Sequence, residues 1–142
     1  MVRWVYKTLG GSKAPDLEDL KKWKEEGIST IINLLDGYYG DLLAQEQKRQ
    51  GFEVIRMPSS MYTQYDKEEI IPVYEYIDEL LNAGKKVVVH CKYGQARSGT
   101  FLAGYLIYKG FPYEKALEEV MKKGFLPQTQ PQIDFLRGLS SR

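Results

Sequence analysis

The sequence predicts a single-domain α/β fold, with a central, mainly parallel sheet of about four to five strands flanked by helices. Three observations support this fold class. Short apolar runs alternate with longer segments whose apolar residues recur at helical spacing. Glycines stand just after several helical segments, as at Gly27, Gly51 and Gly84. The chain has 142 residues, 43% of them hydrophobic, and no repeat or linker, so we expect residues 1–142 to form one domain.

The first half of the chain is predicted to alternate strands and helices. Residues 2–7 have the composition of a strand, and residues 10–15, rich in glycine and ending in proline, are predicted to be a loop. A helix then begins at Asp16, whose spacing from Asp19 is that of a capping box, and ends before Gly27. The other elements predicted in this half are strands at 28–35 and 52–57 and a helix at 41–50.

The second half is predicted to contain the central strand and four helices. Apolar residues of the segment 66–83 fall on one helical face. Residues 85–90 include three consecutive valines, which is typical of a strand buried on both faces. Three more helices are predicted at 98–109, 112–123 and 129–139. In a parallel sheet of this kind, ligands bind at the carboxyl ends of the strands.

The only histidine and the only cysteine of the chain are neighbours at the end of the central strand. After them, a glycine-bearing loop leads into a helix. The backbone N–H groups of such a loop and the unpaired donors of the helix N-terminus can converge on one anion. Cys91 and Arg97 can lie on opposite sides of a bound phosphate, with the guanidinium forked across two oxygens. A thiol in such a place readily becomes a thiolate, which is the nucleophilic form.

The segment His-Cys-x5-Arg-Ser-Gly-Thr at residues 90–100 resembles the signature loop of the cysteine-dependent protein tyrosine phosphatases, specifically their small dual-specificity branch. The resemblance implies a phosphatase-like fold and a reaction without metal or cofactor. Cys91 is expected to form a phosphocysteine, and Arg97 to bind the phosphate. Ser98 is expected to assist the departure of the sulfur or to start the helix, and His90 to be structural. The expected substrate-binding residues are Lys92, Tyr93, Gly94, Gln95 and Ala96.

A second segment, at residues 128–135, resembles the glutamine loop Q-T-x-x-Q-x-x-F of the same superfamily. The resemblance implies that Gln128 and Gln132 position the hydrolytic water. A neutral amide suits this task, because it donates and accepts hydrogen bonds without adding charge. The local pattern alone favours a helix start, with Thr129 as its cap and Pro131 in the first turn.

The general acid is where the sequence departs from the family. The loop that normally carries an aspartate reads Met-Pro-Ser-Ser-Met-Tyr-Thr-Gln-Tyr-Asp at residues 57–66, with serines and Met61 in the expected places. Asp66 is the nearest carboxylate, although its spacing from Glu69 is that of a capping box. Asp36, at the end of a predicted strand, is a second candidate that can face the same cleft. Both candidates stay open at this point.

The substrate is expected to be a phosphorylated protein or peptide, carrying phosphotyrosine and by extension phosphoserine or phosphothreonine. Two alternatives stay open. Lys92, directly after the cysteine, favours a phosphoinositide or inositol phosphate, while Gln95 stands where lipid-directed relatives often carry a second basic residue. A pseudophosphatase that binds phosphate without efficient chemistry is the other alternative, because the usual acid is absent.

Charge and cysteine content limit the expected binding partners and cellular location. Twenty basic and nineteen acidic residues leave a net charge of +1, which predicts no nucleic-acid partner. A single cysteine excludes an internal disulfide. The absence of a secretory segment and of a long apolar stretch predicts no membrane insertion, a cytoplasmic location and a reducing environment. We also expect a monomer.

Overall fold

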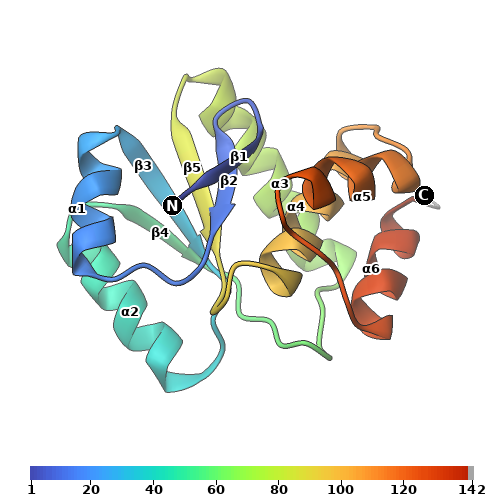
Figure 1. The fold of residues 1–142 in the computed structure, drawn as a ribbon, viewed down its shortest axis with the longest axis horizontal. Coiled ribbons are helices and arrows are strands. Elements are labelled where there is room, and N and C mark those ends of the chain that lie inside the picture. The colour runs from blue at the N-terminus through green and yellow to red at the C-terminus, as the bar shows by residue number, and fades with distance from the viewer. Residues whose placement is uncertain (141–142) are drawn as a thin grey trace.

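The computed structural model describes residues 1–140, so the last two residues of the predicted domain lie outside the described part. These residues form a single-domain α/β fold with one five-stranded sheet and six helices (Figure 1). The sheet order is β1-β2-β5-β3-β4; β1 pairs with β2 in antiparallel fashion, and the other pairs are parallel. The predicted fold class is therefore confirmed. The elements are β1 (Arg3–Tyr6), β2 (Leu9–Ser12), α1 (Leu17–Glu25), β3 (Ile28–Asn33), α2 (Gly37–Arg49), β4 (Glu53–Arg56), α3 (Lys67–Asn82), β5 (Lys86–His90), α4 (Ala96–Tyr108), α5 (Tyr113–Lys122) and α6 (Gln130–Ser140).

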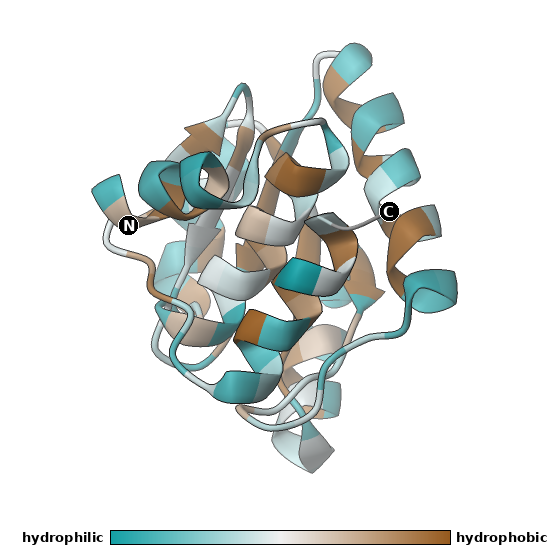
Figure 2. Ribbon diagram, turned by 90° about the vertical axis from the view of Figure 1, so that its right-hand side faces the viewer, coloured by the Kyte–Doolittle hydropathy of each residue, from teal (hydrophilic) through white to brown (hydrophobic). Residues whose placement is uncertain are grey.

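Helices cover both faces of the sheet, and the valines of β5 explain how the two layers are held. In Figure 1, α1 and α2 lie on one side of the sheet, and α3 to α6 lie on the other. Val87 and Val89 pack into the larger core with the helices of the second side, whereas Val88 packs into a smaller core with Trp23 and Ile31. Successive side chains of a strand point to opposite faces, so one run of valines serves both cores. Figure 2 shows brown and teal residues on the same helices, as expected for helices with one buried face.

The sequence prediction was wrong at Gly10 and Gly11, which belong to strand β2 and not to a loop. Glycine weakens a strand by itself, so local preference argued against this assignment. Packing explains the difference. A Cβ added to Gly11 would lie 2.6 Å from the ring of Phe125, and one added to Gly10 would lie 2.8 Å from the backbone oxygen of Arg3. These glycines let neighbouring groups pack directly against the strand.

The second helix was also predicted too short, because α2 begins at Gly37 and not at Asp41. Two glycines in the added first turn have structural roles. Gly37 has a φ of +75°, a conformation that favours glycine. A Cβ added to Gly40 would lie 2.6 Å from the carbonyl oxygen of Leu35, so only glycine allows this close approach. The other nine predicted elements are confirmed, with ends that shift by one or two residues.

The register of the sheet brings three strand ends to the same edge. Ser12 at the end of β2 and Asn33 at the end of β3 both pair with His90 at the end of β5. Cys91 is the next residue, so the loop that follows β5 begins at the carboxyl edge of the sheet, in its middle (Figure 1). Parallel sheets bind ligands at this edge.

Candidate active site

The sulfur of Cys91 accepts two hydrogen bonds from its own loop. The hydroxyl of Ser98 donates to Sγ at 3.1 Å, and the backbone N–H of Gly94 donates to Sγ at 3.3 Å. Helix α4 begins at Ala96 with Gln95 as its N-cap, so Ser98 lies inside the first turn and does not cap the helix. Of its two predicted roles, the geometry therefore fits the one directed at sulfur. Two donors aimed at one sulfur stabilise a negative charge there.

Gly94 is the turning point of the loop that surrounds this sulfur. Its φ is +71°, which is strained for any residue with a side chain. A Cβ at this position would lie 2.6 Å from the backbone nitrogen of Lys13 and 2.8 Å from the carbonyl carbon of Ser12. The loop thus packs directly on the end of β2, and a further hydrogen bond from the N–H of Ala14 to the carbonyl of Lys92, at 3.2 Å, holds it there.

Arg97 lies beside this loop with its guanidinium mostly buried. Its Nη1 donates to the carboxylate of Asp36 at 3.2 Å and to the carbonyl oxygen of Ser59 at 3.0 Å. Asp36 is 59% exposed, whereas Arg97 is 12% exposed, so the carboxylate lies at the open end of the pair. The structure therefore brings Asp36 to the cysteine loop. Among residues 1–140, the side-chain hydrogen bonds of this guanidinium use one nitrogen, which leaves its remaining donors for a forked contact with phosphate.

Asp66 has a different place. It is the N-cap of α3, and its backbone N–H donates to the carboxylate of Glu69 at 3.1 Å, as the capping pattern predicted. The described part of the chain shows no contact between Asp66 and the cysteine loop. Of the two acid candidates, the structure brings only Asp36 to Arg97.

A cavity of about 290 Å³ opens above Cys91. No acidic side chain lines it in the described part of the chain, and Met61 occupies the wall where the family pattern places an aspartate. Lys92 is exposed, with its Nζ 5.3 Å from the centroid of the Tyr93 ring. Gly94 is buried beneath the loop and does not reach the cavity wall. The lining residues are Met61, Cys91, Tyr93, Gln95, Ala96, Arg97 and Gln128.

The structure separates the two glutamines of the second motif. Gln128 lines the cavity, whereas Gln132 is fully buried. The carboxamide oxygen of Gln132 accepts the backbone N–H groups of Gln128 at 2.8 Å and Thr129 at 3.1 Å. Its Nε2 lies 3.7 Å from the sulfur of Met61. Gln132 thus holds the segment before α6 in place, and Gln128 is the glutamine that can contact a bound water.

A buried chain of polar side chains supports the start of the loop. Asn33 donates to the oxygen of Gln47 at 3.2 Å, so the Gln47 amide nitrogen, 2.8 Å from His90 Nε2, is the donor of the next bond. His90 then carries its proton on Nδ1, 3.3 Å from the carbonyl oxygen of Cys91. Burial lowers the pKa of His90 to about 4, which keeps the ring neutral. These contacts fit the structural role predicted for His90.

Sequence reasoning missed Asn33 and Gln47. The available signal was a polar residue inside an apolar strand, since Asn33 follows Ile31 and Ile32. A buried amide needs partners, so its position could have suggested a polar contact. Gln47 had no such signal, because a glutamine on a helix is most often exposed.

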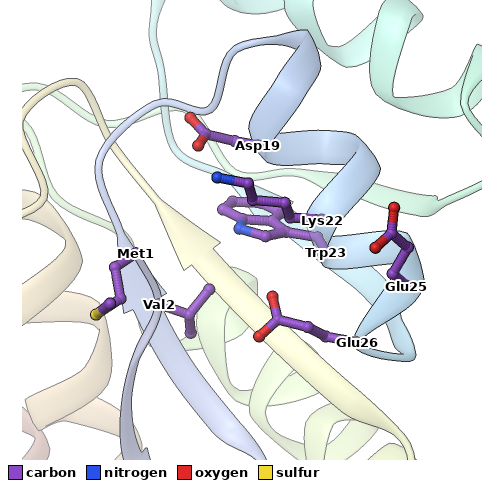
Figure 3. Close-up of a pocket in the computed structure, with 7 residues that line it drawn as sticks. All are labelled: Met1, Val2, Asp19, Lys22, Trp23, Glu25 and Glu26. Atoms are coloured by element: carbon purple, nitrogen blue, oxygen red, sulfur yellow. The ribbon is translucent and has the colours of Figure 1, made fainter.

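A larger hollow, of about 540 Å³, lies elsewhere on the molecule and shares no lining residue with the cavity above Cys91. Figure 3 shows it between α1 and the first residues of the chain, with Lys22 and Trp23 on its wall. Its other charged residues are carboxylates, namely Asp19, Glu25 and Glu26. Among the lining side chains, three carboxylates against one lysine disfavour a phosphate there.

Two further observations concern residues 1–140 as a group. No cluster of three or more histidine, cysteine, aspartate or glutamate side chains is arranged to hold a metal ion. No helix in this part of the chain has the length and apolar character needed to cross a membrane.

The fold and the cysteine loop together define a class. The protein is a small dual-specificity phosphatase-like member of the cysteine-dependent protein tyrosine phosphatase superfamily. Residues 7–111 match the family model described as "Polymorphic toxin system, DSP-PTPase phosphatase", and the chain belongs to this family. The resemblance stated from the sequence is confirmed.

Individual relatives agree with this assignment. Dual specificity protein phosphatase TpbA of Pseudomonas aeruginosa is 26% identical over 119 residues, which cover 83% of this chain and 52% of that protein. Human phosphatidylglycerophosphatase and protein-tyrosine phosphatase 1 is 28% identical over 121 residues, covering 80% of this chain and 60% of the relative. The chain thus spans about half to three fifths of the length of these two relatives.

Among solved structures, the active form of Tk-PTP superposes with a TM-score of 0.85 at 27% identity. The match covers 99% of this chain and 97% of that one. The similarity therefore includes both helical layers and all five strands.

Proposed function

We propose that this protein hydrolyses phosphomonoesters through a phosphocysteine intermediate, with phosphotyrosine of a protein or peptide as the preferred substrate. One observation carries the proposal. The sulfur of Cys91 accepts hydrogen bonds from Ser98 and from the N–H of Gly94, and it shares one cavity with Arg97. A nucleophile, its stabilising donors and a phosphate-binding cation therefore converge where a phosphate can enter.

The first step transfers the phosphoryl group to sulfur. The thiolate of Cys91 forms the S–P bond, while the bond between phosphorus and the tyrosine oxygen breaks. The loop N–H groups and the guanidinium of Arg97 stabilise the charge on the phosphoryl oxygens. The leaving oxygen needs a proton, and Asp36 is the carboxylate that lies beside Arg97 at the open end of the site. We assign it the role of general acid.

The second step releases inorganic phosphate. A water attacks phosphorus and gives a proton to the carboxylate of Asp36, the S–P bond breaks, and the thiolate is restored. Gln128, on the cavity wall, positions that water through its amide. Ser98 stabilises the departing sulfur through its hydrogen bond. The two proposed steps therefore use only groups of the protein and water, without a metal.

The exposed position of the proposed general acid favours aryl phosphates as substrates. A phenol leaves more easily than an alcohol, because its anion is the weaker base and needs less protonation. General acid catalysis contributes about 10² to 10⁴ in rate. An enzyme whose one candidate acid is an exposed carboxylate therefore loses the most rate on alkyl esters, whose leaving groups need the proton most. This argument supports phosphotyrosine over phosphoserine and phosphothreonine.

An inositol or glycerol phosphate is the second candidate substrate. Lys92 is exposed beside the cavity and offers a further cation to a ligand with several phosphates. The human relative is named a phosphatidylglycerophosphatase as well as a protein-tyrosine phosphatase. Gln95 argues for the peptide, since it lines the cavity without adding a charge.

The test is a turnover assay in the presence of a metal chelator. Wild type, Cys91→Ser and Arg97→Ala are assayed on a phosphotyrosine peptide, a phosphoserine peptide, a soluble inositol phosphate and a glycerol phosphate ester. We expect wild type to act fastest on phosphotyrosine and both variants to lose at least about 10³ in kcat/KM. Cys91→Ser is expected to bind the phosphopeptide still.

Other outcomes select other functions. A higher kcat/KM on the inositol or glycerol ester assigns the protein to lipid phosphates. Phosphopeptide binding by wild type without any turnover identifies a pseudophosphatase. Unchanged turnover in Cys91→Ser contradicts the proposed nucleophile.

A further inference from the structure

Arg3, near the N-terminus, donates a hydrogen bond to the backbone of the cysteine loop. Arg3 lies in β1, and its Nη2 donates to the carbonyl oxygen of Gly94, 91 residues away in sequence. Its Nη1 donates to the carbonyl oxygen of Lys123 at 2.9 Å. The guanidinium also lies over the ring of Phe125, 3.9 Å from its centroid. Three independent contacts hold this one side chain.

The packing beneath Arg3 is arranged to allow these contacts. Arg3 pairs with Gly11 across the sheet, and Gly11 has no side chain that would occupy the space now filled by the ring of Phe125. Gly124 is equally constrained, because a Cβ there would lie 2.6 Å from Nη1 of Arg3. The glycines at 11 and 124 and the ring of Phe125 therefore form a seat for the guanidinium.

Gly94 links this guanidinium to the nucleophile. Its carbonyl oxygen accepts from Arg3, and its N–H donates to the sulfur of Cys91 at 3.3 Å. The two groups belong to adjacent peptide units that share the Cα of Gly94, whose φ is +71°, so a carbonyl held by Arg3 restricts the ways in which the N–H can turn away from the sulfur. Partial burial lowers the pKa of Arg3, and its electrostatic interaction with Cys91 acts in the opposite direction.

We propose that Arg3 is a positioning residue of the active site, which restrains the backbone conformation of Gly94 and so stabilises the Cys91 thiolate together with the phosphate cradle. This inference rests on the proposed function and adds to it a residue outside the signature loop. A charged donor is needed at this position, because hydrogen bonds that involve a charged group are roughly twice as strong as neutral ones.

The test compares three variants. Arg3→Met keeps the length of the side chain and its packing on Phe125 but removes the charge. Arg3→Lys keeps the charge without the fork that spans two carbonyls. Arg137→Met is the matched control, because Arg137 also lies over an aromatic ring, that of Tyr113, at 5.4 Å, and has no contact with the cysteine loop.

Two quantities are measured for each variant. The first is kcat/KM on a phosphotyrosine peptide, and the second is the pH midpoint of the alkylation of Cys91 by iodoacetamide. We expect Arg3→Met to lose about tenfold in kcat/KM, the effect of one hydrogen bond to a charged group. We expect its alkylation midpoint to rise by about 0.5 pH unit, because a nearby positive charge is removed. Arg3→Lys is expected to restore most of both.

The alkylation profile is read against the other charged and titratable groups near the sulfur, all of which remain in every variant. These groups are His90 at the end of β5, Lys92 in the loop, Arg97 of α4 with its partner Asp36, and Tyr65 before α3. Tyr65 stays neutral, because burial raises its pKa well above neutrality.

The outcomes distinguish this inference from the proposed function. Alkylation reports on the thiolate even if no phosphoester is turned over. An unchanged midpoint and an unchanged kcat/KM in Arg3→Met overturn the inference, as does an equal change in Arg137→Met. A loss of turnover in Arg3→Met at constant midpoint and lowered Tm assigns Arg3 a purely structural role and also overturns it.

Discussion

The two walls of the active site are built differently. The inner wall, made by residues 90–98, directs side-chain and backbone donors at one sulfur and is itself supported by buried polar partners. The outer wall, made by residues 57–66 and Asp36, has backbone carbonyls and a thioether facing the site. Ser59 uses its carbonyl to hold Arg97, and Met61 uses its carbonyl to accept the hydroxyl of Thr129 at 2.5 Å.

The difference separates two parts of the chemistry. In the proposed mechanism, nucleophilic attack and phosphate binding depend on the inner wall, where the donors are fixed before any substrate arrives. Protonation of the leaving group is proposed to depend on the outer wall, where Asp36 is exposed and forms an ion pair with Arg97. We therefore expect changes in the inner wall to affect all substrates equally, and changes in the outer wall to depend on the leaving group.

Among the variants that keep both Cys91 and Arg97, the largest effect is expected from Gly94→Ala. The added Cβ would lie 2.6 Å from backbone, which has little freedom to move, and the residue would keep a φ of +71°. The loop must shift, and the N–H directed at sulfur moves with it. We expect kcat/KM to fall by about 10² to 10³ on every phosphoester, as for the loss of one preorganised donor.

The control for this variant is Gly84→Ala. Gly84 has a φ of +78° and open space where its Cβ would be, so it carries the backbone strain without the collision. We expect it to lower the free energy of unfolding by about 1 kcal/mol and to leave kcat/KM unchanged. Equal kinetic losses in the two variants would show that strain alone, and not loop geometry, is responsible.

The next effect concerns the outer wall and its acid. We expect Asp36→Asn to lower kcat on phosphotyrosine by about 10² and to lower kcat on p-nitrophenyl phosphate by less than about threefold, because the nitrophenolate leaves without protonation. Asp66→Asn serves as the comparison, since Asp66 caps α3. Steady-state kinetics on the two esters provide the measurement.

The pattern across the two esters decides the role of Asp36. Equal losses on both would mean that Asp36 orients Arg97 and donates no proton. A loss in Asp66→Asn that depends on the leaving group would transfer the role of the acid to Asp66. No loss in either variant leaves the outer wall without a carboxylate acid.

Much of the inner wall could be predicted from the sequence, because its residues are contiguous. A strand, a five-residue loop and the first turn of a helix bring Cys91, Gly94 and Arg97 close together, because these residues are near one another in sequence. The same applies to Asp66, whose spacing from Glu69 indicated its capping contact. Local patterns also predicted the order of helices and strands after residue 16.

Contacts between distant segments could not be predicted. Arg3 and Gly94 are 91 residues apart, so no spacing rule connects them. Asp36 was expected to face the same cleft because it lies at the end of a predicted strand, but its ion pair with Arg97, 61 residues away, was not predicted. The strand at Leu9–Ser12 was missed for the same reason. Its glycines are unfavourable in a strand by local preference, and they are retained there because Phe125 packs against Gly11.

The buried hydrogen bonds that connect Asn33, Gln47 and His90 predict that the stability of the protein depends on pH. Folded His90 gains a proton only near pH 4, whereas the unfolded side chain does so near pH 6.5. Between these values the unfolded state holds more protons, so the free energy of unfolding falls as the pH falls. We expect a loss of about 2 kcal/mol between pH 7 and pH 5, a factor of about 30 in the folding equilibrium.

Urea unfolding of wild type and His90→Gln over this pH range measures the effect. The glutamine oxygen can still accept from Gln47, and it does not titrate. We expect a flatter pH dependence in the variant, whatever its absolute stability. Parallel curves would mean that groups other than His90 cause the loss.

The smallest effect is expected from removing the hydroxyl of Ser98. This variant tests whether one residue of the inner wall acts in the formation or in the hydrolysis of the phosphocysteine. Ser98→Ala removes the 3.1 Å hydrogen bond to sulfur, which makes the thiolate a poorer leaving group when the phosphocysteine is hydrolysed. We expect this second step to slow by about tenfold, the value of one hydrogen bond to a charged atom. The first step should be less affected, because Gly94 and Arg97 still stabilise its charge.

A burst of phenol release before steady state is therefore expected in Ser98→Ala, measured by rapid mixing with p-nitrophenyl phosphate. Thr100→Ala is the matched control, because its buried hydroxyl donates to the carbonyl of Ala96 at 2.7 Å in the same helix and does not reach the sulfur. A burst in both variants would reflect a general disturbance of α4. A lower rate in Ser98→Ala without a burst would place the hydroxyl in the first step, where the thiolate attacks, and would leave departure of the sulfur to the loop N–H of Gly94 alone.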